Sequence, residues 1–230
     1  MKKFYLLIFL FIFLTSSFSQ DTLKNEELDL ALKSIKEKYE LVGMSVVLVE
    51  NGSIKFSKGY GFRDLERSLP VNSETKYRIA SISKVFVAVA VMQLYEKGLL
   101  KLDDDVNNYL DFSLRNPKFP NDIITFKMLL SHTSSLRDGS KYGDFLSETG
   151  LKPSSLHVKE LLTPKGTFFS EDIVDSNNGP KSCYFTYGNI NFGILASLIE
   201  KITNQRFDKY FEENIFKPLG MLKSDVIHPD

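Results

Sequence analysis

The 230-residue sequence predicts an α/β fold of the α+β type, in which an antiparallel hairpin precedes a largely helical region. Two β-rich runs, Met44–Glu50 and Ser53–Tyr60, are joined by Asn51-Gly52, the pair that favours a two-residue hairpin turn. Two later apolar stretches, Val85–Lys97 and Ile190–Ile202, are long enough for core helices, and we expect the first to be buried all round. Because two strands alone are unstable in water, the hairpin needs further packing partners.

The first residues have the pattern of an export signal. Two lysines precede an apolar run over residues 4–14, and small residues follow it before Gln20. The run is too short for a comfortable membrane span. We therefore expect residues 1–19 to be a cleaved signal peptide and residues 20–230 to form one domain. The protein is then exported to the periplasm or the extracellular space, with no stable membrane span.

The segments around the hairpin follow simple patterns. Apolar residues recur at helical spacing over residues 23–39, which predicts an amphipathic surface helix. We expect Gly59 and Gly61 to end the second strand and residues 64–70 to form a connecting loop.

The helical region is interrupted by one irregular stretch. We expect a short helix under an acidic cap at Val106–Leu110, a capped helix at Phe126–Ser131 and an aromatic-rich helix at Phe207–Phe216. Residues 137–182 contain scattered Gly, Pro, Ser and Asn, and only Val158–Leu162 has a helical pattern. A long irregular segment in a compact domain is usually functional or mobile, so we expect it to form a wall of a substrate cleft.

Composition argues against several classes of function. The 29 basic and 29 acidic residues cancel, and no basic block is present, so nucleic acid is not an expected partner. His132, His157 and His228 lack ligand spacing, and we expect no metal or other cofactor. The acidic run Asp103–Asp105 suits helix capping better than calcium binding. The single Cys183 cannot form an internal disulfide, and we expect it to be a small apolar filler.

Ser81 and Lys84 are the centre of the candidate site. If a helix begins near Ser81, the two side chains share one face of its first turn and can exchange a proton. This is the geometry of a nucleophile and its base, and the backbone N–H of Ser81 could help to hold an oxyanion. The alternative is that Ser81 only caps the helix and Lys84 is solvated. Ser-x-x-Lys is a weak signal, because Ser73–Lys76 repeats it before a β-type run.

Five motifs follow one another along the chain: Gly59-Tyr60-Gly61, Arg78–Lys84, Leu129–Leu136, Tyr187–Gly193 and Pro218–Met221. In this order they resemble the serine β-lactamase-related family. Within that family the sequence is similar to class C β-lactamases, D-alanyl-D-alanine carboxypeptidases and related esterases. The resemblance runs from about residue 43 to the end of the chain.

The resemblance implies a β-lactamase/transpeptidase-like fold, with an antiparallel sheet flanked by helices and a helical subdomain. It implies an exported serine hydrolase that acts on a β-lactam, D-amino-acid amide or ester through an acyl-enzyme. Ser81 would be the nucleophile, and Lys84 and Tyr187 would move the proton, with either as general base. Asn189 would bind the substrate and hold Lys84 in place. The expected partner is a small-molecule or peptide substrate.

The sequence departs from the family pattern at two places. Ser135 stands where the turn after His-Thr-Ser usually has glycine, a change that we expect to be tolerated. The third family motif, Lys-Thr-Gly or His-x-Gly on a later strand, does not occur before Asp230, and Lys165-Gly166-Thr167 has the wrong order and place. We therefore expect a fragment that lacks the C-terminal strands of the sheet and is poorly active alone. A non-catalytic relative that binds a peptide or protein partner is the alternative.

Overall fold

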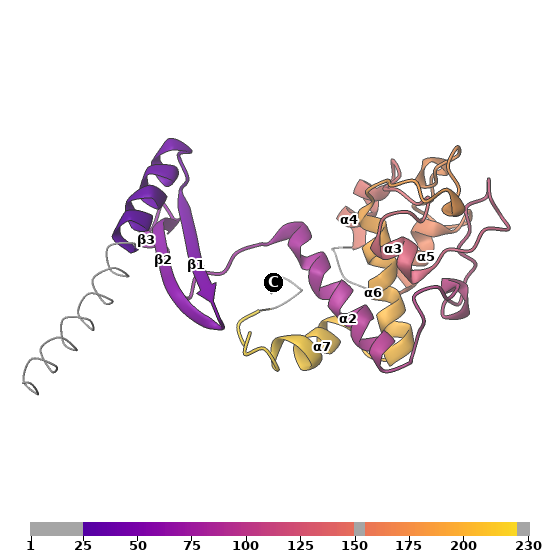
Figure 1. Ribbon diagram of the computed structural model, residues 1–230. Helices are drawn as coiled ribbons and strands as arrows, with labels where there is room; N and C mark the ends of the chain where they lie inside the picture. The colour runs from indigo at the N-terminus through magenta and orange to yellow at the C-terminus, as the bar shows by residue number, and fades with distance from the viewer. Residues whose placement is uncertain (1–24, 150–154, 225–230) are drawn as a thin grey trace, which may run out of the picture. The chain divides into compact units, whose positions relative to one another are not determined.

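The computed structural model describes residues 25–149 and 155–224, and the predicted signal peptide at residues 1–19 lies outside them. The chain divides into two compact units, one ending at Arg78 and the other beginning at Ile79 (Figure 1). Within the two described segments, no helix combines the length and apolar character that crossing a membrane requires.

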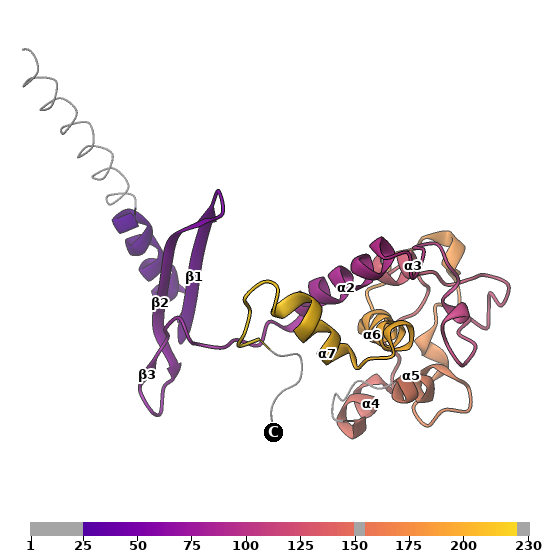
Figure 2. The same cartoon turned by 90° about the horizontal axis from the view of Figure 1, so that it is seen from below.

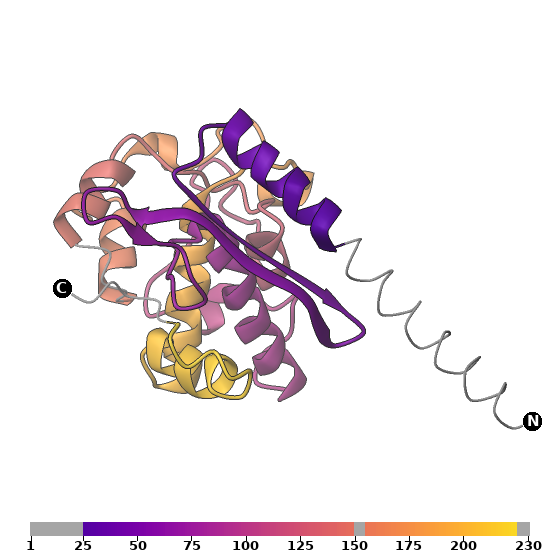
Figure 3. The same cartoon turned by 90° about the vertical axis from the view of Figure 1, so that its left-hand side faces the viewer.

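The first unit is a three-stranded antiparallel sheet with a helix over residues 25–38 beside it (Figure 3). Its strands lie in the order β1 (Gly43–Glu50), β2 (Ser53–Asp64) and β3 (Leu69–Pro70). Asn51 and Gly52 connect β1 to β2 with φ values of 49° and 72°, as a two-residue turn with left-handed backbone requires. The predicted hairpin and the predicted helix before it are both confirmed.

Strand β2 is longer than predicted. It continues through Gly59 and Gly61 to Asp64, so these glycines do not end the strand. They permit close backbone approach instead, because a Cβ on Gly59 would lie 2.6 Å from the carbonyl oxygen of Val71. The predicted loop at 64–70 is also partly wrong, since its last two residues pair with β2 as β3.

Asp29 fastens the helix of the first unit to the sheet. Its carboxylate accepts a hydrogen bond of 2.8 Å from the Tyr60 hydroxyl and lies 2.7 Å from the Lys58 Nζ, both on β2. Lys33, one helical turn along, and then Lys58 hold the pKa of Asp29 well below its usual range. Burial and the Asp29 carboxylate raise the pKa of Tyr60 to about 12.

The second unit is built from helices. The α-helices are α2 (Lys84–Glu96), α3 (Phe126–Leu130), α4 (Tyr142–Thr149), α5 (Ser155–Leu162), α6 (Asn189–Thr203) and α7 (Phe207–Phe211). The 3₁₀ turns are η1 (Ala80–Ser83), η2 (Val106–Asn108), η3 (Glu171–Ile173) and η4 (Pro180–Ser182), and the π-helical turn η5 (Glu212–Phe216) continues α7. Helix α6 lies at the centre, in contact with α2, α3, α5 and α7 (Figure 2).

Facing sides of α2 and α6 form part of the core of this unit. Ala90 and Val91 of α2 and Ile194 of α6 are inaccessible to solvent. The apolar helix at 190–202 is confirmed as α6, and burial fits its pattern. The prediction that the helix after Ser81 is buried all round is wrong, since Val85 on the other face of α2 is 59% exposed.

The capping predictions are confirmed. The Thr125 side chain accepts a hydrogen bond from the backbone N–H of Met128 at the start of α3. Asp105 accepts one in the same way from Asn107 in η2, although the expected helix there is only a single 3₁₀ turn. Thr125 and Asp105 therefore act as caps, and only Asp105 belongs to the acidic run.

The irregular stretch contains more structure than predicted. Helix α5 covers the expected apolar segment at 158–162, whereas α4 was not expected. Cys183 is exposed at the end of η4 with a left-handed φ of 54°, so the prediction of a buried filler is wrong. The reason is local: the cysteine closes a turn on the surface and does not face the core. His228 lies outside the described residues.

Candidate active site

Ser81 occupies a turn that presents it to solvent. It lies in η1, between Ala80, whose φ is 44°, and the start of α2 at Lys84. A left-handed conformation is uncommon for alanine and costs roughly 1–2 kcal/mol, so the chain before Ser81 is strained. The helix that the sequence predicted near Ser81 therefore begins as a 3₁₀ turn, and Ser81 itself is exposed.

The Lys84 amine is held between two oxygens. Its Nζ donates hydrogen bonds to the Oγ of Ser81 at 3.1 Å and to the Oδ1 of Asn189 at 2.7 Å. The same Nζ lies 5.1 Å from the ring centroid of Tyr187, within the range of a cation–π contact. The side chain is half-buried. Lys84 is thus directed at the serine and not toward bulk water.

The Tyr187 hydroxyl completes the group. It lies 2.9 Å from the Oγ of Ser81 and donates to the Oδ1 of Asn189 at 3.3 Å. The nearby Lys84 amine, and then the hydrogen bond with Ser81, lower the pKa of Tyr187 from its ordinary value. The structure therefore brings together all four side chains that the sequence analysis selected, and all of them belong to the second unit.

Asp138 is a part of this site that the sequence analysis did not select. Its carboxylate accepts hydrogen bonds from the Asn189 backbone N–H at 3.0 Å, the Asn189 Nδ2 at 2.8 Å and the Ile190 N–H at 2.9 Å. In sequence it stands in an irregular Arg-Asp-Gly segment, which is typical of a loop. The one sequence feature that could have indicated a role for Asp138 in the site was its place just after the Leu129–Leu136 motif.

The imidazole ring of His132 packs against the ring of Tyr187. The two ring centroids are 4.6 Å apart, and the Nδ1 of His132 accepts a 3.4 Å hydrogen bond from the backbone N–H of Gly188. Burial, and then the charge of Lys84, lower the pKa of His132 below its usual 6.5. A histidine in a polar turn is more often satisfied by the backbone than a general base, and the hydrogen bond from Gly188 fits that interpretation.

Ser135 is the residue at which the sequence first departs from the family pattern. Its φ is 65°, in the left-handed region where glycine is favoured. The serine hydroxyl accepts a hydrogen bond of 3.1 Å from Asn116, and both residues are buried. This contact helps to hold serine at the position where the resemblance led us to expect glycine.

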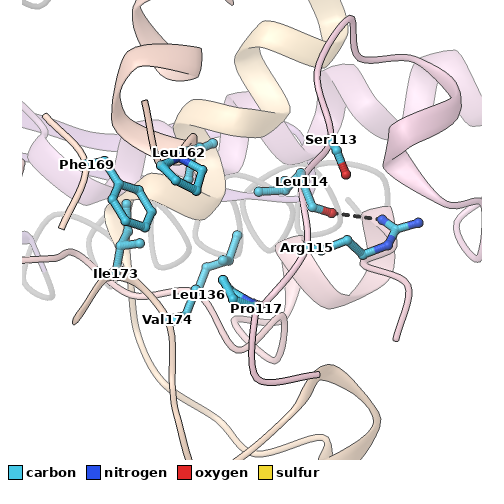
Figure 4. A pocket seen from close by; sticks show the side chains of 10 residues that line it. Ser113, Leu114, Arg115, Pro117, Leu136, Leu162, Phe169, Ile173 and Val174 are labelled. Atoms are coloured by element: carbon cyan, nitrogen blue, oxygen red, sulfur yellow. Dashed lines mark hydrogen bonds between the residues drawn. The ribbon is translucent and has the colours of Figure 1, made fainter. Parts of the chain in front are cut away.

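A separate pocket of about 240 Å³ lies in the second unit (Figure 4). Apolar side chains such as Leu136, Leu162 and Phe169 line it, and the four site residues are not among its lining residues. Arg115 at its edge donates to the carbonyl oxygen of Leu114 and is paired with Asp105. The pocket is therefore distinct from the group around Ser81. Among the described residues, no cluster of His, Cys, Asp and Glu is placed to hold a metal ion.

A model of the Beta-lactamase family matches residues 28–230 of this chain. The protein belongs to the beta-lactamase family. Protein flp of Staphylococcus aureus (strain N315) is 28% identical over 201 residues, which cover 85% of this chain and 37% of flp. The chain thus spans well under half the length of this curated relative.

Solved structures show the same fold. The octameric penicillin-binding protein homologue from Pyrococcus abyssi has a TM-score of 0.69 at 27% identity, over 85% of this chain and 43% of that protein. FmtA from Staphylococcus aureus has a TM-score of 0.66 at 26% identity, over 86% of this chain and 49% of FmtA. The predicted family and the predicted β-lactamase/transpeptidase-like fold are confirmed.

Proposed function

We propose that the protein is an exported serine hydrolase that forms an acyl-enzyme at Ser81. The observation that carries the proposal is the position of the Ser81 Oγ, 2.9 Å from the hydroxyl of Tyr187 and 3.1 Å from the Nζ of Lys84. An alcohol becomes a useful nucleophile when a base within hydrogen-bond reach takes its proton. Membership of the beta-lactamase family supports hydrolytic chemistry at this serine.

Tyr187 is the better candidate for the general base. Its hydroxyl lies 2.9 Å from the Ser81 Oγ, slightly closer than the Lys84 Nζ at 3.1 Å. The Lys84 amine also lowers the pKa of Tyr187, which makes the phenolate more accessible. A base with a pKa nearer the working pH is more effective than an ordinary tyrosine with a pKa of about 10.

The reaction then follows from the contacts. The Ser81 Oγ bonds to the carbonyl carbon of an amide, β-lactam or ester, and its proton passes to the Tyr187 oxygen. As the C–N or C–O bond of the substrate breaks, Tyr187 returns the proton to the leaving nitrogen or oxygen. A water molecule, activated by the same base, next attacks the acyl carbon and releases the carboxylic acid and free Ser81.

Lys84 and Asn189 have supporting roles in this mechanism. The charge on Lys84 stabilises the phenolate, and Asn189 keeps Lys84 in place through the 2.7 Å contact. An amide nitrogen carries two hydrogens, and Asp138 accepts one from the Nδ2 of Asn189. We assign the second to a substrate oxygen, which makes Asn189 the substrate-binding residue of the site.

Labelling of the serine tests the proposal. A fluorescent penicillin and a fluorescent fluorophosphonate cover the β-lactam and the ester-like classes of reagent. We expect at least one to label the wild-type chain and to leave Ser81→Ala unlabelled. Ser73→Ala is the matched control, because Ser73 begins the second Ser-x-x-Lys of the chain. If neither probe labels Ser81, in this chain or in a longer one that contains it, the protein is a non-catalytic relative that binds a peptide or partner.

Export has its own test. The full chain is expressed in a bacterium, the cells are fractionated, and the N-terminus of the product is sequenced. We expect the mature protein to begin at Gln20 and to leave the cytoplasm. A product that keeps its first 19 residues in the cytoplasmic fraction would contradict export without affecting the proposed chemistry.

A further inference from the structure

The carboxylate of Asp138 caps a helix from a distant part of the chain. It accepts the backbone N–H groups of Asn189 and Ile190 at the start of α6, and it lies 51 positions before Asn189 in the sequence. The residue at the N-cap position itself, Gly188, has no side chain that could do this. A carboxylate is well placed there because the N-terminus of a helix has unpaired N–H groups and a positive end.

The same carboxylate also contacts the side chain that holds Lys84. Oδ2 of Asp138 accepts a 2.8 Å hydrogen bond from the Nδ2 of Asn189, and the Oδ1 on the other side of that amide accepts from Lys84. An ionised carboxylate can only accept, and an ammonium can only donate. A flipped amide would place oxygen against oxygen and NH₂ against the ammonium. The pair Asp138 and Lys84 therefore permits one orientation of Asn189.

The loop that carries Asp138 is held firmly. Leu136 forms a β-bridge with Val174, and the guanidinium of Arg137 lies 2.6 Å from the carboxylate of Asp175. Asp175 is 4% exposed, and its backbone N–H donates to the carbonyl oxygen of Ser135 at 2.8 Å. A rigid support of this kind is what the precise placement of another side chain requires.

We propose that Asp138 is a positioning residue that sets the amide orientation of Asn189 and thereby holds the Lys84 amine beside Ser81. Its effect on acylation rests on the proposed function, whereas its effect on Lys84 does not. A role limited to capping α6 is the competing explanation, and it would act on the whole helix without involving the Asn189 side chain.

A double-mutant cycle on the full chain separates the two roles. Asp138→Ala, Asn189→Ala and the double variant are treated with acetic anhydride, and acetylation of Lys84 is followed by mass spectrometry at several pH values. The exposed Lys127 in the same digests is the internal reference. We expect Asp138→Ala to speed acetylation of Lys84 by about two- to tenfold, which corresponds to the loss of one ordinary hydrogen bond. In the Asn189→Ala background we expect no further change.

The possible outcomes are distinct. If Asp138→Ala raises the acetylation rate of Lys84 equally with and without Asn189→Ala, or raises it in neither case, the positioning role is overturned. Fluorophosphonate labelling of the same proteins reports on the proposed function. If the wild type is not labelled but the mutant cycle is non-additive, the proposed acyl-enzyme chemistry is wrong and the positioning role of Asp138 is retained. If the wild type is labelled and the cycle is additive, the positioning fails alone.

A measurement on the wild-type chain covers the case in which Asp138→Ala does not fold. In a nitrogen–proton NMR spectrum, we expect one Nδ2 hydrogen of Asn189 to exchange with water more slowly than those of the exposed Asn121. If both Nδ2 hydrogens exchange as fast as those of Asn121, the amide is not held and the proposal is wrong.

Discussion

The hydroxyl of Tyr187 lies 2.9 Å from the Oγ of Ser81, although 106 positions separate the two residues in the chain. Packing of α2 against α6 produces this contact, because Ser81 stands just before the first helix and Tyr187 just before the second. The starts of two neighbouring helices thus lie close together. Lys84 and Asn189, the first residues of α2 and α6, join them there by a 2.7 Å hydrogen bond.

Removing the Tyr187 hydroxyl tests its assignment as base. Tyr187→Phe keeps the ring that packs on His132 but loses the proton acceptor, so we expect labelling of Ser81 to slow by about a hundredfold or more. Circular dichroism should show an unchanged fold. Labelling of Ser81 at the wild-type rate in the Phe variant would show that Tyr187 is not the base.

The pH dependence of labelling has a predicted sign. The pKa of Tyr187 is lowered from its ordinary value of 10.0, and in the proposed mechanism the phenolate is the active form. Labelling should therefore accelerate as the pH rises through that pKa, with the midpoint of the rise below pH 10. In Lys84→Met the lysine charge is lost, so we expect the rise to move to higher pH and the rate at pH 7 to fall. Lys76→Met, in the second Ser-x-x-Lys, is the control, and equal pH profiles for all three proteins would contradict the role of Lys84.

His132 should make stability depend on pH. Because its pKa in the folded protein lies below 6.5, the unfolded state binds more protons as the pH falls past 6.5. The free energy of unfolding should therefore decrease between about pH 6.5 and the pKa of the folded protein. His132→Asn tolerates the left-handed φ of 57° but cannot titrate, so its loss of stability should be smaller. Urea unfolding at pH 7.5 and pH 5 measures this, and equal losses in the two proteins would refute it.

Two glycines of the first unit should respond to alanine for different reasons. Gly52 has a φ of +72° and open space around it, so Gly52→Ala adds backbone strain alone, roughly 1 kcal/mol. A Cβ at Gly59 would lie 2.6 Å from the backbone oxygen of Val71, which cannot move without displacing the chain next to β3. We expect Gly59→Ala to cost about 1–3 kcal/mol, the larger loss in thermal unfolding. A larger loss for Gly52→Ala would contradict this account of the sheet.

Short-range patterns carried most of the correct predictions. The Asn51-Gly52 turn and the Thr125 cap depend on neighbours within a few residues, which a sequence displays directly. The selection of Ser81, Lys84, Tyr187 and Asn189 also depended on local motifs, and it needed the family resemblance to connect positions that lie far apart.

The failures involve contacts between distant segments. The motif just before Asp138 places it near the site, but no local pattern indicates that it caps a helix 51 positions later. The strand through Gly59 and Gly61 depends on pairing with residues beyond the turn, and glycine signals a break when it is considered alone. The exposure of Val85 could not be inferred from the sequence. Hydrophobicity shows that a helix is apolar, but it does not show which face of the helix packs against another element.

The central claim is that Ser81 becomes acylated, and peptide mapping of the labelled protein tests it most directly. The wild-type chain, Ser73→Ala and Ser81→Ala are incubated with a penicillin or with a fluorophosphonate, digested and analysed by mass spectrometry. We predict the mass of the opened β-lactam or of the phosphonyl group on the peptide that contains Ser81, in the wild type and in Ser73→Ala, and its absence from Ser81→Ala. An adduct that persists in Ser81→Ala, or that maps to another serine, would contradict the account.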